Sequence, residues 1–344
     1  MKTIIETMPR RSDDAVPVER EDAIDCLKGI LVLFMALYHS INYTPHYNLA
    51  FVYMAFLPPS FIFLAGFLLT HIYTRKYDLR DRKLHLRLLK RGAKLLALFT
   101  VMNLVVQIVL MTPGRHPVEG ALAFFSRWQS VYFAGSGRVA VFEILLPIAY
   151  FLLLSPLVFF AMWLRRWLVP VLAVGLCALC WLLEQRHHAG ENLLLLSAGL
   201  LGMACGVIPL ATIRRISQRW GIIIPVYLLY RWLSAAYGES YLVQTSDVLV
   251  TLLFLYGLLD RFHTPNQFFE GLALLGKYSL VAYIIQIAWL QVFVHLFGRD
   301  HGRVVEVLAL FAATTAISYF AALVTDFCRS RYRWSDRLYH AAFA

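Results

Sequence analysis

The sequence predicts an all-α protein, a polytopic membrane helix bundle of about ten transmembrane helices. Of its 344 residues, 60% are hydrophobic and only 15% carry a charged side chain, compared with about 45–50% and about 25% in ordinary soluble domains. The mean hydropathy is +0.63, and apolar stretches of about 20 residues recur from end to end. Because lipid offers the backbone no hydrogen-bond partner, such stretches are expected to be helices, whereas barrel strands would be shorter and would alternate polar with apolar residues. This composition excludes a water-soluble globule.

Ten apolar stretches supply the candidate spans, at residues 23–43, 51–73, 92–112, 139–164, 167–183, 193–212, 221–237, 242–259, 278–298 and 304–326. The seventh stretch carries Arg231 and the eighth carries Asp247, so these two are the weakest and the count ranges from nine to eleven. We therefore expect an N-terminal tail over residues 1–22, a transmembrane domain over residues 23–326 and a C-terminal tail over residues 327–344.

The distribution of Lys and Arg between the spans predicts the orientation of the chain. With the N-terminus inside, 23 of these residues fall in inside segments and six in outside loops, and eight of the 23 lie in residues 74–91. Positive charge concentrates in cytoplasmic loops, so both termini are predicted to be cytoplasmic. The net charge of +11 therefore reflects topology, and no nucleic-acid partner is expected. Residues 1–22 are polar and the first apolar stretch shows no cleavage pattern, so the first span is expected to be permanent.

No metal site is predicted from the cysteines and histidines. The five cysteines lack framework spacing, and Cys177 and Cys180 lie inside an apolar stretch where they are expected to pack. His187 and His188 are adjacent and have no ligand spacing around them.

The first span carries three ionisable residues, Asp25, Lys28 and His39. The eleven steps from Lys28 to His39 rotate the helix by about three full turns, so both side chains share a face, separated by roughly 16 Å. One interpretation is an Asp25–Lys28 pair that snorkels to the inner interface together with a structural histidine. The other is a polar stripe across the bilayer, with a cation for an anionic ligand at one end and an imidazole for proton transfer at the other. Spacing alone leaves both open.

Two further charged residues have alternative interpretations. Arg231 is costly inside an apolar stretch, so it either pairs with Asp247 or lines a hydrated cavity. Glu143 begins the fourth span at a depth similar to that of His39. It is either an acid favoured by the helix dipole or a carboxylate that orients the imidazole.

Four stretches of the chain are similar to a known family. IDCLKGILVLFMALYH (24–39) resembles the start of the integral-membrane acyltransferase 3 family, whose first helix has an acidic residue, arginine-glycine, and a histidine eleven positions after the arginine; Lys28 stands at the arginine position. PPSFIFLAGFLL (58–69), with the basic loop that follows it, resembles the second helix of that family. LGKYSLVAYIIQIAWLQ (275–291) resembles a late helix, with Gln286 where the family often has histidine. FEILLPIAYFLLLSP (142–156) is similar to the glucan-succinylating branch.

The resemblance implies transfer of an acetyl or short-chain acyl group from cytoplasmic acyl-CoA, as donor substrate, to a hydroxyl of an extracytoplasmic or membrane-associated glycan. It also implies an integral protein of a bacterial inner (plasma) membrane, with membrane lipid and a glycan or sugar as partners. His39 would act as the general base and Glu143 would orient it. The donor would contact Asp25, Lys28, Arg75, Lys76 and Arg91, and the acceptor would contact Arg231 and Gln286.

The alternative function is a transporter or exporter of a small or lipid-linked carbohydrate, without covalent change. Such a carrier would also be basic on its inner side and would hold a few intramembrane charges. The sequence shows no half-to-half repeat and no pair of broken helices, and its charges cluster in the first span rather than at a midplane, which favours the enzyme. The sequence makes no prediction of oligomeric state.

Overall fold

The computed structural model is all-helical over the residues it describes, which are 22–42, 53–109, 117–134, 141–186, 190–237, 240–262, 264, 266–298 and 303–343. Its helices are α1 (Asp22–Asn42), α3 (Leu57–Lys76), α4 (Arg82–Val109), α5 (Pro117–Ser126), the π-helical turn η1 (Ser130–Ala134), α6 (Leu145–Leu164), α7 (Leu168–Gln185), α8 (Glu191–Cys205), α9 (Leu210–Ser217), α10 (Trp220–Tyr237), α11 (Tyr241–Phe262), α12 (Gln267–Lys277), α13 (Ser279–Phe297), α14 (Val304–Arg331) and α15 (Arg333–Phe343).

Within the described residues, eight helices are long and apolar enough to cross a membrane, and the bent pair α8 and α9 would make nine. The prediction of an all-helical membrane protein is confirmed, and nine spans, the lower end of the expected range, are reached when the bent pair is counted as one span. The seventh predicted span is the helix α10, whose Arg231 and polar-tipped aromatic residues leave it outside this set. The orientation of the termini and the tail boundaries remain predictions.

The sixth predicted span is interrupted. α8 and α9 meet at an angle of 103°, and Pro209 lies at the N-cap of α9. Proline has no backbone N–H and disfavours helical geometry in the residue before it, which favours a break at this position. α9 consequently leaves the direction of α8 and packs against α11.

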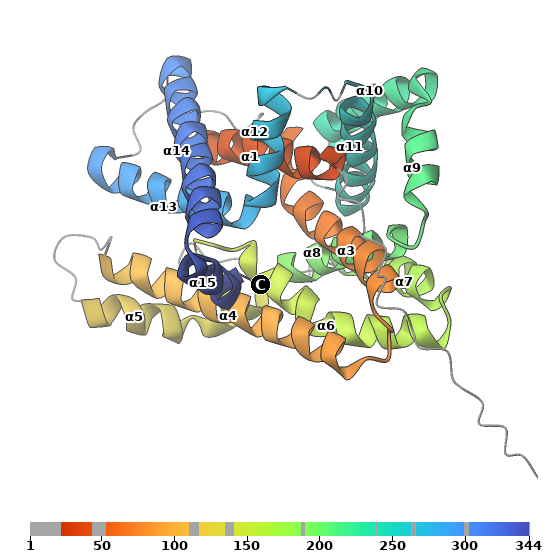
Figure 1. The fold of residues 1–344 in the computed structure, drawn as a ribbon, viewed down its shortest axis with the longest axis horizontal. Coiled ribbons are helices and arrows are strands. Elements are labelled where there is room, and N and C mark those ends of the chain that lie inside the picture. Colours follow the sequence, from red (N-terminus) through yellow and green to blue (C-terminus); the bar gives the residue numbers. More distant parts are fainter. Residues whose placement is uncertain are drawn as a thin grey trace, which may run out of the picture.

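The helix α1 carries more of the predicted site residues than any other helix and packs against five others. It contacts α12, α13, α14, α11 and α3, while α4 packs against both α5 and α6 along the lower edge of Figure 1. The contact of α1 with α12 is very close, since a Cβ atom built on Gly29 would lie 2.0 Å from the Leu272 carbonyl oxygen. One built on Gly276 would lie 1.8 Å from the Asp25 carbonyl oxygen. Only glycine permits this approach, which fixes the position of the first turns of α1.

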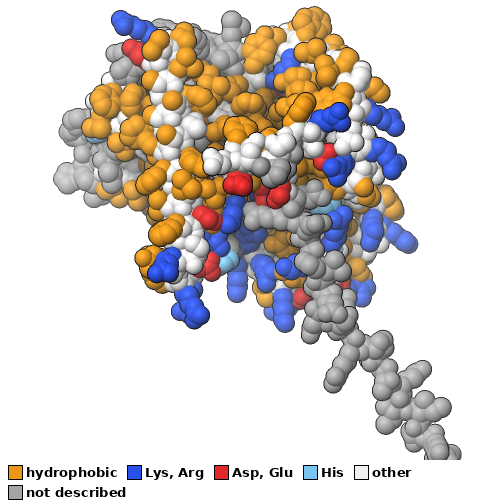
Figure 2. Space-filling model, turned by 45° about the horizontal axis from the view of Figure 1, so that its top comes forward, with side chains coloured by type: hydrophobic (Ala, Val, Ile, Leu, Met, Phe, Trp, Pro, Cys, Tyr) orange, Lys and Arg blue, Asp and Glu red, His pale blue; other side chains and the backbone are white. Residues whose placement is uncertain are grey.

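Apolar and basic side chains occupy different parts of the surface in view. Figure 2 shows apolar side chains over most of one face and many Lys and Arg side chains gathered toward its lower and right edges. Large exposed apolar residues are numerous on the outer helices, as in α7 and α14, where lipid rather than water would cover them. The chain is therefore an integral membrane protein with several spans.

Candidate active site

His39 lies in the last turn of α1 and faces α13. Its ring centroid is 6.1 Å from that of Tyr283 and 5.4 Å from that of the adjacent Tyr38. The Nε2 atom of His39 is buried and has no hydrogen-bond partner among the residues that the structure describes. A buried polar atom without a partner costs about 1–3 kcal/mol, so the site retains an imidazole nitrogen that a bound hydroxyl group or water would satisfy.

Gln286 places a second unsatisfied polar atom at the same helix interface. Its Nε2 donates to the Val32 carbonyl oxygen at 3.1 Å, whereas its Oε1 is buried without a partner. Tyr283 precedes Gln286 by three residues, so both side chains project from one face of α13. Val32 is seven residues before His39, which is about 10 Å along α1. His39 Nε2 and Gln286 Oε1, on α1 and α13, are therefore both buried hydrogen-bonding atoms without a partner among the described residues.

At the other end of α1, Lys28 and Asp25 form an ion pair with an Nζ to Oδ1 distance of 2.7 Å. The Asp25 side chain is almost completely buried and that of Lys28 is 22% exposed. The pairing expected from their i,i+3 spacing is therefore present. The remaining exposure of Lys28 leaves its ammonium group accessible to a ligand.

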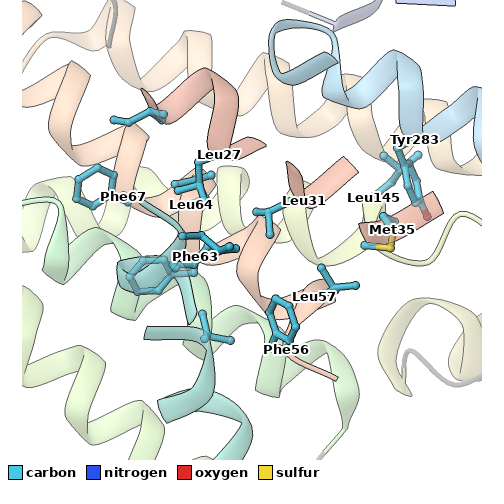
Figure 3. Close-up of a cluster of buried hydrophobic side chains, with 14 of the residues drawn as sticks. Leu27, Leu31, Met35, Phe56, Leu57, Phe63, Leu64, Phe67, Leu145 and Tyr283 are labelled. Carbon is cyan, nitrogen blue, oxygen red and sulfur yellow. The ribbon is translucent and has the colours of Figure 1, made fainter. Parts of the chain in front are cut away.

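The interior between Lys28 and His39 is filled. Leu31 and Met35 lie on the same face of α1, and both are buried in the main apolar cluster. Figure 3 shows Leu31 among neighbouring apolar side chains and Met35 close to Leu145 and Tyr283. An acyl group passing from one end of this face to the other would require these side chains to move.

Of the three remaining predicted donor residues, Arg75 and Lys76 end α3, and Arg91 lies in the third turn of α4, beyond the loop of residues 77–81. Arg75 and Lys76 are exposed, and the Lys76 ammonium group lies 5.9 Å from the centre of the Tyr77 ring. Arg91 donates from Nη1 to the Tyr73 hydroxyl at 3.1 Å. These cations form an accessible basic surface, separate from the buried His39 ring.

Arg231 pairs with Asp247 of α11, as the first of its two interpretations expects, and its predicted contact with substrate stays a prediction. Its Nη1 also donates to the Tyr53 carbonyl oxygen at 2.8 Å. Asp247 is buried and accepts hydrogen bonds from Ser234 at 3.2 Å and from Thr251 at 3.0 Å. The guanidinium group lies over two aromatic rings, those of Phe56 and Tyr227. Arg231 therefore ties α10 to α11, and only its buried Nε lacks a partner.

Glu143 lies two residues before α6, outside the span. The structure does not join it to His39, since no hydrogen bond links the two side chains, both of which are described. Glu143 as a whole residue is exposed. Its carboxyl group is nevertheless partly desolvated, and this desolvation, together with the negative charge of Glu191, raises the pKa of Glu143 to about 7. Glu143 can therefore exchange a proton near neutral pH, but its orienting role remains a prediction.

Tyr283 contacts the His39 ring but was not among the site residues predicted from the sequence. Its position one helical turn before Gln286 was the available signal, because residues three apart share a face. For metals, the described part of the chain contains no cluster of three His, Cys, Asp or Glu residues able to hold an ion. The adjacent histidines, His187 and His188, lie outside the described residues.

Comparison with known proteins gives one result for the whole membrane domain. Residues 21–323 match the sequence model of the acyltransferase 3 family, described as an acyltransferase domain. No curated protein and no solved structure matches the chain. The family match includes α1, where His39 lies, and α13, where Gln286 lies.

Proposed function

Since this chain belongs to the acyltransferase 3 family, we propose that it transfers an acetyl or short acyl group from cytoplasmic acyl-CoA to a hydroxyl group of an extracytoplasmic or membrane-associated glycan. We place it in a bacterial inner membrane, as its family resemblance implies. The single observation that carries the proposal is the buried His39 imidazole, whose Nε2 has no partner within the structure.

In the proposed reaction, the neutral imidazole of His39 accepts the proton of the acceptor hydroxyl. The hydroxyl oxygen then attacks the thioester carbonyl carbon, an oxygen–carbon bond forms and the carbon–sulfur bond breaks. The departing CoA thiolate takes up the proton held by the imidazole, so the enzyme returns to its starting state. Tyr283 limits the orientation of the ring, and Glu143 contributes no hydrogen bond to it.

Gln286 is suited to hold a substrate at this interface. Its amide nitrogen is engaged with Val32, which fixes the side chain, and its Oε1 stays available to accept a hydrogen bond from a hydroxyl group. This arrangement favours a polar, hydroxyl-bearing acceptor over an apolar one, because binding would satisfy a buried acceptor atom.

The donor would bind through its anionic phosphate groups at the opposite end of α1. Lys28 is partly exposed there, and Arg75 and Lys76 are exposed at the end of α3. Cations of this kind attract phosphate groups. Because Leu31 and Met35 fill the interior between the two ends, the reaction also requires helices or side chains to shift so that the thioester reaches His39.

The test uses the full chain reconstituted in phospholipid vesicles, with radiolabelled acetyl-CoA and succinyl-CoA as donors and an envelope carbohydrate fraction as acceptor. We expect label to enter the carbohydrate together with release of free CoA thiol. His39→Gln should lose at least about a hundredfold in rate, the lower range for general-base catalysis. The matched control is His295→Gln, at an exposed position of α13.

Two results would contradict the proposal. One is full transfer activity in His39→Gln vesicles that contain folded protein. The other is movement of labelled carbohydrate across sealed vesicles without any covalent label, which would indicate the transporter.

A further inference from the structure

An apolar cavity of about 220 Å³ lies between α1, α3, α9 and α11. Its lining includes Leu27, Phe67 and Leu252, and the only polar atoms among its lining side chains belong to Cys205 and Tyr256. Figure 3 shows Leu27 and Phe67 near Leu64, at the end of the apolar cluster away from Tyr283. An apolar cavity of about 150 Å³ stays free of water and takes up apolar molecules. The lining of this cavity is likewise apolar, so the cavity suits an apolar ligand.

The cavity reaches the protein surface beside α9. Two of its lining residues, Ile208 and Ile216, are 40% and 43% exposed, so the cavity reaches the protein surface there. In a membrane-spanning protein, the medium at such an opening consists of lipid acyl chains.

α9 adds a basic face to this opening. Ile213 and Ile216 line the cavity, whereas Arg215 lies two residues after Ile213 and so projects from the opposite side of the helix. Arg215 and the following Arg219 are exposed, and no ion pair engages either of them within the described residues. Arg214 differs, because it is bound to Asp260 of α11 at 2.9 Å and holds α9 in place. α9 therefore has the form of a helix lying in the membrane interface.

We propose that this cavity is a binding site for an anionic phospholipid, with one acyl chain in the cavity and the phosphate group beside Arg215 and Arg219. The apolar lining of the cavity would contact the lipid acyl chain, and the basic outer face of α9 would attract the negatively charged phosphate group. The acyl-CoA donor fits this cavity less well than a phospholipid does. Its thioester would meet only two polar groups in the lining, the Cys205 thiol and the Tyr256 hydroxyl. The site is also separate from His39, so the inference does not depend on the proposed reaction.

The test uses the full chain in phosphatidylcholine vesicles that contain a phosphatidylglycerol probe with a photoreactive group at the end of its acyl chain. After irradiation, mass spectrometry maps the labelled peptides. We expect adducts on the cavity-lining segments of α9 and α11, and fewer with a phosphatidylcholine probe. Arg215→Gln/Arg219→Gln should reduce the preference for phosphatidylglycerol by about fivefold for each arginine removed, from the attraction of one basic residue to an anionic surface.

The matched control is Arg165→Gln/Arg166→Gln, at two exposed positions between α6 and α7, which should leave the preference unchanged. Labelling in the wild-type protein that avoids the cavity lining would overturn the proposal, whether or not the variants fold. Loss of the lipid adduct on adding palmitoyl-CoA would assign the cavity to the donor chain and would also overturn it. His39→Gln should retain the adduct even if transfer is lost, so failure of one proposal is distinguishable from failure of the other.

Discussion

Removing Arg231 should destabilise the protein strongly, because it would leave the negative charge of Asp247 buried and uncompensated. The Asp247 side chain is only 3% exposed, and that of Arg231 is 17% exposed. Removing one partner of a buried ion pair typically costs about 3–5 kcal/mol. We expect Arg231→Met to fall in this range, since Ser234 and Thr251 offer neutral hydrogen bonds to Asp247 but no positive charge.

The double variant Arg231→Met/Asp247→Leu should recover much of the loss, because replacing both partners removes the buried charge as well. The measurement is unfolding in mixed micelles with increasing sodium dodecyl sulfate, followed by tryptophan fluorescence, for the wild type, both single variants and the double variant. The control is Arg186→Met, at an exposed position just after α7, which should change the free energy of unfolding by less than about 0.5 kcal/mol.

If Arg231→Met lowers the free energy of unfolding no more than the control does, the buried ion pair does not stabilise the protein. The same conclusion follows if the effects of the two single substitutions simply add in the double variant. The same proteins address the predicted contact of Arg231 with substrate. If Arg231 serves only to join α10 and α11, the KM for acceptor in a folded Arg231→Lys variant should equal that of the wild type.

Two further predictions concern Glu143 and the contact between α1 and α12. The folded state raises the pKa of Glu143 from 4.5 to about 7, so the unfolded chain ionises first and stability should fall as pH rises from about 4.5 to 7. Glu143→Gln should flatten this part of the pH profile of the unfolding midpoint; an unchanged slope would contradict the assignment. Gly276→Ala should cost about 3 kcal/mol or more, because its new Cβ would meet the Asp25 carbonyl oxygen at 1.8 Å. The control Gly175→Ala has nothing within 4 Å and should unfold no more easily than the wild type; equal stability of the two alanine variants would show that α1 and α12 can separate freely.

The helices and the ion pair between Asp25 and Lys28 could be predicted from the sequence because local interactions determine both. The apolar stretches predicted the helices because lipid enforces internal backbone hydrogen bonding. The pairing of Asp25 with Lys28 was also accessible, since residues three apart on a helix are neighbours. Two predicted spans differ from simple membrane helices. A hydropathy window averages across Pro209, where the chain bends sharply, and α10 contains both apolar residues and a paired arginine.

A helical membrane protein with a basic set of loops, and a histidine on the same helix face as a lysine, could be predicted from the amino-acid sequence. The packing of the helices was needed to show that Arg231 is held by Asp247, that His39 Nε2 and Gln286 Oε1 lack partners among the described residues, and that Leu31 and Met35 are buried between Lys28 and His39. The physical reason is that helices in lipid can be apolar all round, so hydropathy does not encode which faces meet. Contacts such as that of Val32 with Gln286, 254 residues apart, depend on the spatial order of the helices, which side-chain packing and interhelical hydrogen bonds establish.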